Sequence, residues 1–395
     1  MAESVTSNYF PSQVASDLEK QSKEYGLKVG KAIEYEWFKR DSGTNRFASN
    51  QNNFHKLRLY ARGEQAIQKY KDELSINGDL SYLNLDWKPV PIVPKFVDIV
   101  VNGISERTFD IKAYSQDPFG VSKRTKYMEG ILADMKTRDL NAFTQEAFGI
   151  SISSTPDEKM PESEEELQLH MQLNYKQAVE IAEEQAINTI LEGNRYELTK
   201  KRVNYDLTVL GIGCVKNSFT KAEGVKVEYV DPANIVYSYT ESPYFEDIYY
   251  VGEIKVVPLN ELKKEFPDLT DEDLKEVGKQ GYQSTGFYNR SLAESTAIDK
   301  NQVQVMYFNF KTYANEVYKV KETATGASKV IVKDDRFNPP NELIEARFGK
   351  MSRQIEVLYE GALILGTNKL LKWEISKNMI RPKSDYTKVK MNYSI

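Results

Sequence analysis

Residues 85–109 read LDWKPVPIVPKFVDIVVNGISERTF and consist of a proline-rich half followed by a half with helical spacing of apolar residues. Three prolines in the first ten of these residues each fix φ, lack an N–H and restrain the preceding residue to extended backbone. This half predicts a stiff arm in which Trp87 and Ile92 are the apolar side chains to bury. Pro94 suits the first turn of a helix, where a missing N–H costs least. From Lys95 onward a helix is predicted, because apolar residues recur at helical spacing. They are Phe96, Ile99, Val100 and Ile104.

The composition describes a chain that can bury a core and excludes several kinds of site. The 395 residues are 40% hydrophobic and 28% charged, enough for two or three domains. The single cysteine, Cys214, excludes an intrachain disulfide, and only two histidines are present, so we expect no metal and no cofactor. A net charge of −5 is not that of a protein built to hold DNA by broad neutralisation of phosphates.

Neither a membrane segment nor a secretory signal is expected. The chain lacks any run of about 18 apolar residues, the length that would suggest a transmembrane helix. Its N-terminus, MAESVTSNYFPSQ, has no basic region followed by an apolar one, so it does not read as a secretory signal.

The order of patterns predicts an α+β protein in three parts. Residues 1–53 are polar and read as an N-terminal arm, with a linker at 41–53. Residues 54–300 read as a mixed α and β domain, including a long helical stretch around 164–210 that leads into strands, with a break at Gly193-Asn194. Residues 301–395 are rich in β pattern. There we expect one hairpin from strands at 303–313 and 315–323, and a second across 355–373 with its turn at Glu360-Gly361.

Three motifs that could suggest chemistry are better explained by structure. Gly211 and Gly213 resemble part of a dinucleotide-binding loop, but the third glycine position is Lys216 and the order is helix then strand, so we reject that interpretation. Cys214 lies in an apolar strand and is interpreted as a small buried hydrophobic residue. Asp231 precedes a proline, where an aspartate that caps a turn is much more common than a catalytic acid.

Three stretches in this order resemble phage portal proteins, the ring-shaped head-to-tail connectors of tailed double-stranded-DNA phages, and most of all the crAss-like type. They are 85–109, 196–219 and 225–268. The resemblance implies a helical wing with β-hairpins, and a non-enzymatic ring of commonly twelve copies at one capsid vertex. Its implied partners are the major capsid protein, the packaging terminase, neck or tail adaptor proteins and the double-stranded DNA that passes through the channel. The implied location is the virion, and the host cytoplasm during assembly. The later helices of such proteins are not found here, so we expect residues 301–395 to continue the wing or lead to the clip, and the C-terminus to be incomplete.

Two sets of residues are candidates for contacts in such an assembly. The subunit-packing candidates are the residues of the proline arm: Trp87, Pro89, Pro91, Ile92 and Pro94. The candidates for contact with DNA or a partner are basic: Lys200, Lys201, Arg202, Arg347, Lys350 and Arg353. For Arg347, Lys350 and Arg353, solvated loop charge is an equal alternative. For the three residues 200–202 the alternative is salt bridges to a neighbouring copy.

Two other classes of function stay open. Another neck or tail adaptor, or a scaffold-type interaction protein, would have the same composition. A nucleic-acid enzyme would need clustered carboxylates for metal ions. The acidic runs at Glu162–Glu166 and Asp271–Asp273 instead look like helix starts.

Overall fold

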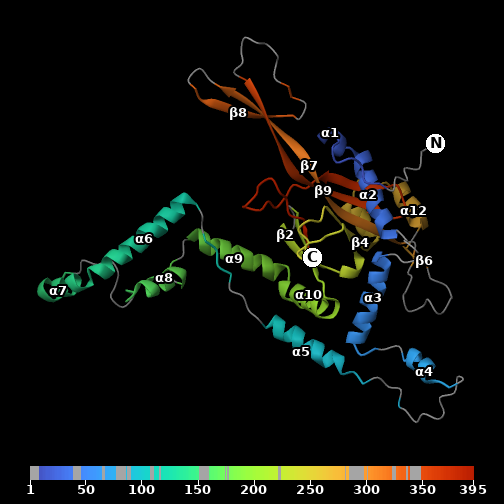
Figure 1. Ribbon diagram of the computed structural model, residues 1–395, viewed down its shortest axis with the longest axis horizontal. Helices are drawn as coiled ribbons and strands as arrows, with labels where there is room; N and C mark the ends of the chain where they lie inside the picture. The colour runs from blue at the N-terminus through green and yellow to red at the C-terminus, as the bar shows by residue number, and fades with distance from the viewer. Residues whose placement is uncertain are drawn as a thin grey trace. The chain divides into compact units, whose positions relative to one another are not determined.

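The computed structural model describes residues 9–38, 46–64, 67–76, 86, 90–106, 111–114, 117–150, 160–173, 175, 178–220, 224–280, 282–283, 298–299, 301–322, 326–334, 337–338 and 348–395 (Figure 1). The chain forms two compact units. The sheet unit comprises Met1–Ser105 with Leu198–Ile395, and the helical unit comprises Glu106–Glu197. Helices and antiparallel sheets are both present, so the α+β class is confirmed.

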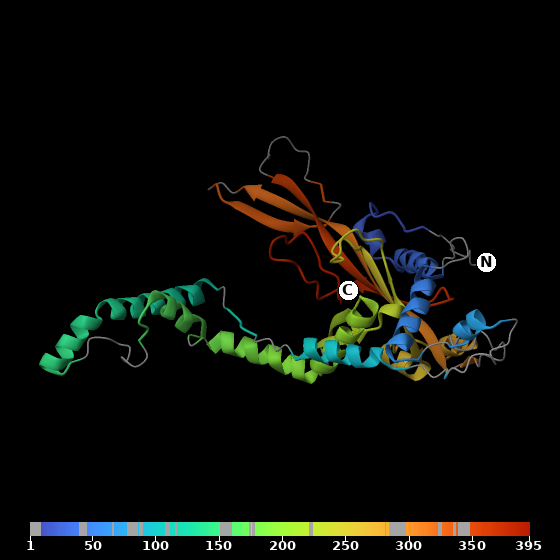
Figure 2. The ribbon, with the colours of Figure 1, turned by 60° about the horizontal axis from the view of Figure 1, so that its bottom comes forward.

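An antiparallel six-stranded sheet forms the centre of the sheet unit. Its strand order is β10-β9-β7-β4-β3, and β8 adds to the far half of β7. The strands are β3 (Ile235–Tyr237), β4 (Tyr250–Pro258), β7 (Gln302–Glu322), β8 (Ser328–Lys333), β9 (Phe348–Ile364) and β10 (Leu370–Ile375). β4 pairs with residues 302–310 of β7, whereas β8 pairs with residues 317–322. The far halves of β7 and β9 therefore project with β8 beyond the rest of the sheet (Figures 1 and 2).

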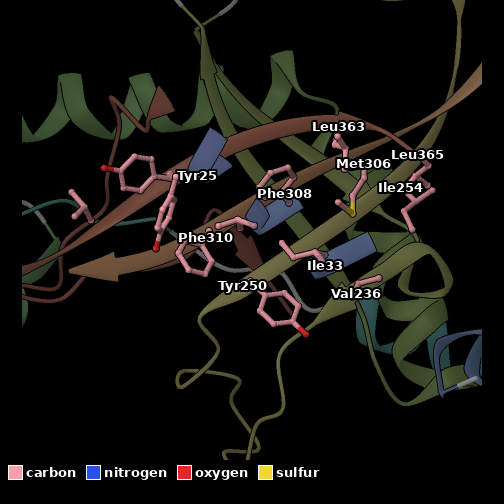
Figure 3. Packing of buried hydrophobic residues seen from close by; sticks show 13 residues of the cluster. Tyr25, Ile33, Val236, Tyr250, Ile254, Met306, Phe308, Phe310, Leu363 and Leu365 are labelled. Carbon is pink, nitrogen blue, oxygen red and sulfur yellow. The ribbon is translucent and has the colours of Figure 1, made fainter. Parts of the chain in front are cut away.

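Helix α2 (Lys23–Phe38), which follows α1 (Asp17–Lys20), covers one face of this sheet. Its buried residues Tyr25, Val29 and Ile33 pack on alternate residues of the strands (Figure 3). These strand residues include Met306, Phe308, Phe310, Tyr359 and Leu363. The alternation follows from the period of two in a strand, which sends successive side chains to opposite faces.

The intervening strand residues face the other side of the sheet. Val303, Val305 and Ile364 pack there with Leu262 of α11 (Leu259–Glu265) and Val277, which lies in α12 (Asp271–Gln280). A second sheet of three strands, in the order β11-β1-β2, shares a further buried cluster with Val251 and Ile248. Its strands are β1 (Cys214–Thr220), β2 (Gly224–Val230) and β11 (Tyr393–Ser394).

The remaining elements of the sheet unit are mostly helices. They are α3 (Arg46–Ala61), α4 (Gln68–Leu74), α5 (Val93–Ser105), α10 (Tyr196–Leu210), the 3-10 helix η2 (Pro232–Asn234) and a small hairpin of β5 (Tyr282–Gln283) and β6 (Ile298–Asp299). The helix predicted from Lys95 is confirmed as α5, with Pro94 in its first turn.

The helical unit has a small core of its own. It contains α6 (Pro118–Lys136), α7 (Arg138–Phe148), α8 (Glu164–Leu173) and α9 (Ala178–Gly193). Ile131, Leu167 and Met171 are buried together, and the ring of Tyr127 stacks on that of Tyr175 at 4.4 Å. Within the described residues of the whole chain, no helix combines the length and the apolar character needed to cross a membrane.

The structure corrects the expected division of the chain. Helix α3 begins at Arg46, so the linker expected at 41–53 is wrong from that residue on, and the same helix runs through the boundary expected between 53 and 54. The boundary expected at 300 also fails to separate units, because β7 pairs with β4 along nine residue pairs. The compact units instead divide near 105 and 197.

The helical stretch expected around 164–210 is not one long helix. It forms α8, α9 and α10 before β1 begins at Cys214. The break predicted at Gly193-Asn194 is confirmed, because α9 ends at Gly193 and Arg195 adopts a positive φ of 49° before α10 starts. An α-helix cannot continue through such a residue.

Two turns expected in the β-rich part are wrong. Residues 302–322 form one continuous strand in place of a hairpin of 303–313 and 315–323. The hairpin partner of this strand's far half is β8, which follows the Gly326 turn. Glu360-Gly361 lies inside β9, and the chain turns later, at Gly366, whose φ is +77°.

Candidate functional site

Helix α5 presents an apolar face to solvent. The helix is strongly amphipathic in sequence, yet only Val101 among its residues is buried. The exposed side chains recur at the spacing of a single helix face. They are Ile92, just before the helix, followed by Phe96, Ile99, Val100 and Ile104, and between 42% and 60% of each is exposed. Several large apolar side chains together on one exposed face commonly mark a surface that another molecule covers.

The other side of α5 is anchored to the sheet unit. Asn204 Nδ2 of α10 donates to Ser105 Oγ at 3.2 Å, and Lys200 Nζ donates to the Ser105 carbonyl at 3.3 Å. At the start of the helix, the Gly63 turn packs closely on the arm. A Cβ on Gly63 would lie 2.7 Å from the Cβ of Pro91, and the φ of Gly63 is +79°. The exposed apolar face therefore belongs to a helix that is held in place at both ends.

The predicted packing residues of the proline arm have different positions. Trp87 and Pro89 lie outside the described residues. Pro91 contacts the Gly63 turn, and Pro94 lies in the first turn of α5. Ile92 is 57% exposed, so it packs in no core of this chain and remains a candidate for a subunit interface.

The basic candidates do not gather into one patch. On α10, Lys200 is bonded to Ser105, Lys201 is exposed, and the Arg202 guanidinium lies over the Tyr229 ring at 5.7 Å. In β9, strand alternation sends Lys350 and Arg353 to opposite faces. Lys350 Nζ donates to Asn338 Oδ1 at 3.2 Å, and Arg353 pairs with Glu316 at 2.9 Å. Arg347 lies outside the described residues.

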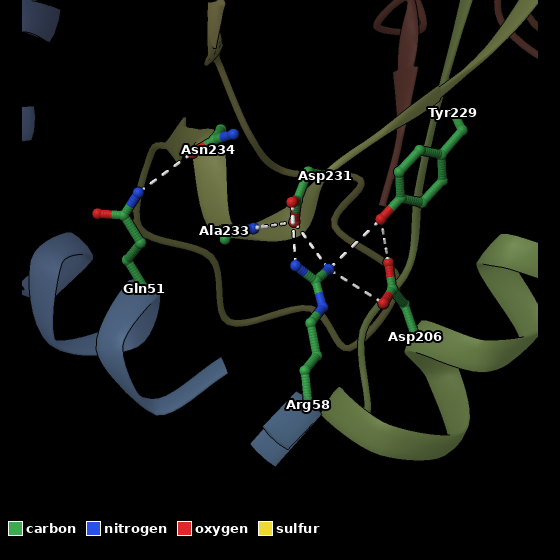
Figure 4. A network of polar contacts seen from close by, with 7 residues as sticks. All are labelled: Gln51, Arg58, Asp206, Tyr229, Asp231, Ala233 and Asn234. Carbon is green, nitrogen blue, oxygen red and sulfur yellow. Dashed lines mark hydrogen bonds and ion pairs between the residues drawn. The ribbon is translucent and has the colours of Figure 1, made fainter. Parts of the chain in front are cut away.

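Four side chains meet in a polar network around Arg58 (Figure 4). The Arg58 guanidinium of α3 donates to both carboxylate oxygens of Asp231, at 3.0 and 2.8 Å. It also donates to Asp206 Oδ1 of α10 at 3.0 Å. Tyr229 of β2 donates its hydroxyl to the other oxygen of Asp206. This network connects α3, α10 and the end of β2.

The network contains one buried carboxylate. The side chain of Asp206 is only 3% exposed, and burial raises its pKa although the hydroxyl of Tyr229 and the guanidinium of Arg58 oppose the change. Asp231 also accepts from Ala233 N at 3.0 Å, so the prediction that it caps the turn is confirmed. Arg58, Asp206 and Tyr229 carry no local sequence signal, and only the fold brings them together.

A second buried carboxylate, Glu253 of β4, is also paired. Tyr393 donates its hydroxyl to Glu253 Oε2 at 3.1 Å, and Lys255 Nζ lies 3.1 Å from Oε1. Lys216 Nζ lies 3.5 Å from Oε2 and 5.2 Å from the centres of both the Tyr307 and the Tyr393 rings. Burial, and then the charge of Glu253, raise the pKa of Tyr393, so its phenol stays protonated and keeps donating. These contacts connect β11 to β4 of the central sheet.

The motifs that could suggest chemistry have structural explanations here. Cys214 is fully buried, and burial raises the pKa of its thiol to about 12, so it is a small apolar residue, as predicted. Gly211 adopts a φ of +77° in the turn from α10 to β1, which is the order helix then strand. In the part of the chain that the structure describes, no three histidine, cysteine, aspartate or glutamate side chains are grouped to hold a metal ion.

No protein-family model matches the chain, and no curated protein matches it.

Proposed function

We propose that the chain is a subunit of a phage portal, a closed ring of about twelve copies at one capsid vertex through which double-stranded DNA is packaged and ejected. In this role the chain is structural and not an enzyme. The ring would contact the major capsid protein, dock the terminase during packaging and later bind neck or tail adaptor proteins, first in the host cytoplasm and then in the virion. The proposal joins the sequence resemblance over 85–109, 196–219 and 225–268 to the surface of α5.

One observation supports assembly above the others: the exposed apolar face of α5 within the stretch that carries the resemblance. Phe96 and Ile99 are each more than half exposed although the helix is fixed at both ends. Burying an apolar side chain of this size against another molecule contributes roughly 1.5–3 kcal/mol. A second copy that covers this face would gain that contribution for several side chains without first ordering the helix.

Native mass spectrometry and negative-stain class averages of the purified full chain test the proposal. We expect closed rings of about twelve copies with a central channel. A six-fold ring or a filament would favour the neck or tail adaptor, and a chain that remains monomeric under all assembly conditions would contradict the portal proposal.

A matched pair of substitutions tests the role of α5 in assembly. Phe96→Asp places a charge on the apolar face, whereas Asn102→Asp adds the same charge to an exposed position on another side of the helix. We expect the first substitution to shift rings to monomers and the second to leave them intact. Circular dichroism and thermal melting of both variants would show that the fold is preserved. Rings that tolerate Phe96→Asp would exclude this face from the interface.

A further inference from the structure

The far end of the central sheet has two faces of different chemistry. We call residues 313–322 of β7, all of β8 and residues 348–355 of β9 the strand extension (Figures 1 and 2). Directly opposite residues of antiparallel strands point to the same face. In this register Lys319 is opposite Lys350, and Lys321 is opposite Lys329. Lys333, opposite Val317, lies on that face as well.

Five lysines thus share one face, which we call the lysine face: Lys319, Lys321, Lys329, Lys333 and Lys350. Within the described residues of the strand extension, the other side chains of this face are uncharged. They are Tyr313, Asn315, Val317, Ile331, Ser352 and Gln354. A carboxylate, Glu356, follows on the same face opposite Tyr313, and it is paired with Lys311 at 3.8 Å. The Glu316–Arg353 ion pair lies on the opposite face, where Tyr318, Val320, Val330, Val332 and Met351 are also found. A chain of net charge −5 therefore concentrates positive charge on one side of three strands.

This concentration places like charges next to each other. Like charges directly opposite each other in a sheet are destabilising, and Lys319–Lys350 and Lys321–Lys329 are two such pairs. Two of these lysines contact uncharged groups among the described residues. Lys350 bonds to an amide oxygen, and Lys319 lies 5.9 Å from the centre of the Phe337 ring. An anionic partner would reduce the repulsion between the opposite lysines.

Protection of a sheet edge explains only part of the pattern. Edge strands often carry lysines that prevent pairing with other chains, and β8 is an edge strand with exposed side chains. Lys350 lies on β9, which is also an edge strand here because β10 pairs only with its residues 359–363. Lys319 and Lys321, however, lie on β7, which has β8 on one side and β9 on the other. Lysines at these interior positions do nothing for the edge.

We propose that the lysine face binds the phosphate backbone of double-stranded DNA. Lys329 and Lys333 are about 13 Å apart along β8 at 3.3 Å per residue. Over that length a duplex presents roughly eight phosphate charges, at one per 1.7 Å of helix axis. An anionic membrane fits less well, because a membrane-binding face needs apolar side chains beside its basic ones. Here the more exposed apolar side chains, Val330, Val332 and Met351, point away from the lysines, and Ile331 and Tyr313 are the exposed apolar side chains described on the lysine face.

The inference rests on the proposed function only for the choice of duplex DNA as the natural polyanion. Binding and ring formation can be measured separately. In the test, a fluorescent 24-base-pair duplex of arbitrary sequence is titrated with the full chain, and anisotropy is read at several salt concentrations. The test variant is the triple substitution Lys321→Gln, Lys329→Gln and Lys333→Gln. The matched control replaces three exposed lysines elsewhere, Lys23→Gln, Lys28→Gln and Lys377→Gln.

We expect the wild type and the control to bind with a steep dependence on salt. The test variant should bind at least about tenfold more weakly at low salt. Its slope of log K against log salt should be smaller by about 2.7, at roughly 0.9 for each phosphate that the three lysines no longer neutralise. Equal weakening in the test variant and the control would overturn the inference, as would binding to phosphatidylserine vesicles without binding to DNA. Wild-type rings that do not bind the duplex would overturn this inference and leave the ring proposal standing. A monomer that binds DNA through these lysines would overturn the ring proposal and leave this inference standing.

Discussion

Phe308 and Gly361 lie directly opposite each other in β7 and β9, and the ring of Phe308 occupies the space that a side chain at position 361 would need. A Cβ on Gly361 would fall 2.6 Å from both Cε atoms of this ring. On the helix side, a Cβ on Gly30 of α2 would lie 3.3 Å from Cε1 of the same ring. Phe308 is 1% exposed, so its ring is enclosed between a helix and a neighbouring strand that each carry a glycine (Figure 3).

Gly361→Ala should therefore destabilise the sheet unit. Alanine is normally the better residue in a strand, because glycine adds flexibility and packs nothing. Here the added methyl group must displace a buried ring, and overpacking of this kind costs typically 1–3 kcal/mol. Urea unfolding followed by tryptophan fluorescence would show a lower midpoint of the transition.

Gly349→Ala in the same strand is the control for this substitution. Nothing lies within 4 Å of the position its Cβ would take. We expect its midpoint to equal or exceed that of the wild type. Replacing Phe308 by leucine in the Gly361→Ala background should restore part of the stability, because the smaller side chain leaves room for the methyl group. Equal effects of the two alanine substitutions would show that the ring does not constrain position 361.

Arg58→Met should destabilise the sheet unit by leaving two carboxylates without their cation. Asp206 is buried, and removing one partner of a buried pair costs about 3–5 kcal/mol. The side chain of Arg58 is itself 20% exposed, so we expect about 3 kcal/mol, the lower end of that range. Arg62→Met, one turn later and exposed, should change the free energy of unfolding little. Similar destabilisation in the two variants would mean that the network contributes nothing beyond helix surface charge.

The destabilisation by Arg58→Met should depend on pH in a defined direction. Burial already raises the pKa of Asp206, and removing the cation raises it further. A carboxyl group with a raised pKa in the folded state contributes most stability when protonated, and that contribution disappears as the pH rises. The loss in free energy of unfolding relative to the wild type should therefore be smaller near pH 4 and larger at pH 7. Asp206→Asn in the same background should remove this dependence.

Sequence periodicity was sufficient to predict the elements whose structure is determined by neighbours along the chain. The apolar spacing of 96–104 predicted α5, and the position of Asp231 before a proline predicted its cap. Periodicity failed to predict the structure where a residue distant along the chain determines it. Glu360-Gly361 resembles a turn in sequence, but the glycine is there to accommodate the ring of Phe308 from another strand.

The candidate site shows the same contrast. That α5 is apolar on one face could be predicted, but that this face stays exposed could not, because the sequence does not say which face α3 and α10 cover. Arg58, Asp206 and Tyr229 come from distant segments, and no spacing rule relates them. The lysine face becomes apparent only when the register of β7, β8 and β9 is known, because a shift by one residue would divide its lysines between two faces.

Asp273 should make the stability of the sheet unit sensitive to acid. Hydrogen bonds from Lys369 and from Thr270 lower the pKa of Asp273 to about 2. A carboxyl group with a lowered pKa in the folded state stabilises that state when ionised, and this contribution disappears as the pH falls from about 4 to about 2. The bond to Lys369 connects α12 to the turn before β10.

Asp273→Asn should flatten the dependence of the melting temperature on pH between 4 and 2. Glu272→Gln, the neighbouring exposed residue of the same helix, serves as the control and should keep the slope of the wild type. Thermal melting at half-unit steps of pH would measure both. A slope that is unchanged in Asp273→Asn would show that the bond to Lys369 is not maintained in solution.

Cys214 should be inert in the folded protein and reactive once the sheet unit opens. The thiolate is the nucleophile in alkylation, and burial together with the nearby charge of Glu253 raises the pKa of this thiol to about 12. The side chain is also fully buried, so iodoacetamide cannot reach it without an opening of β1. We expect almost no alkylation at pH 8 in native buffer and complete alkylation in denaturant, as read by mass spectrometry.

A control chain with Cys214→Ser and Ser352→Cys carries its thiol at an exposed position of β9 and should react at the rate of a free thiol in both conditions. Rapid labelling of Cys214 in native buffer would mean that the contact of β1 with the central sheet opens readily.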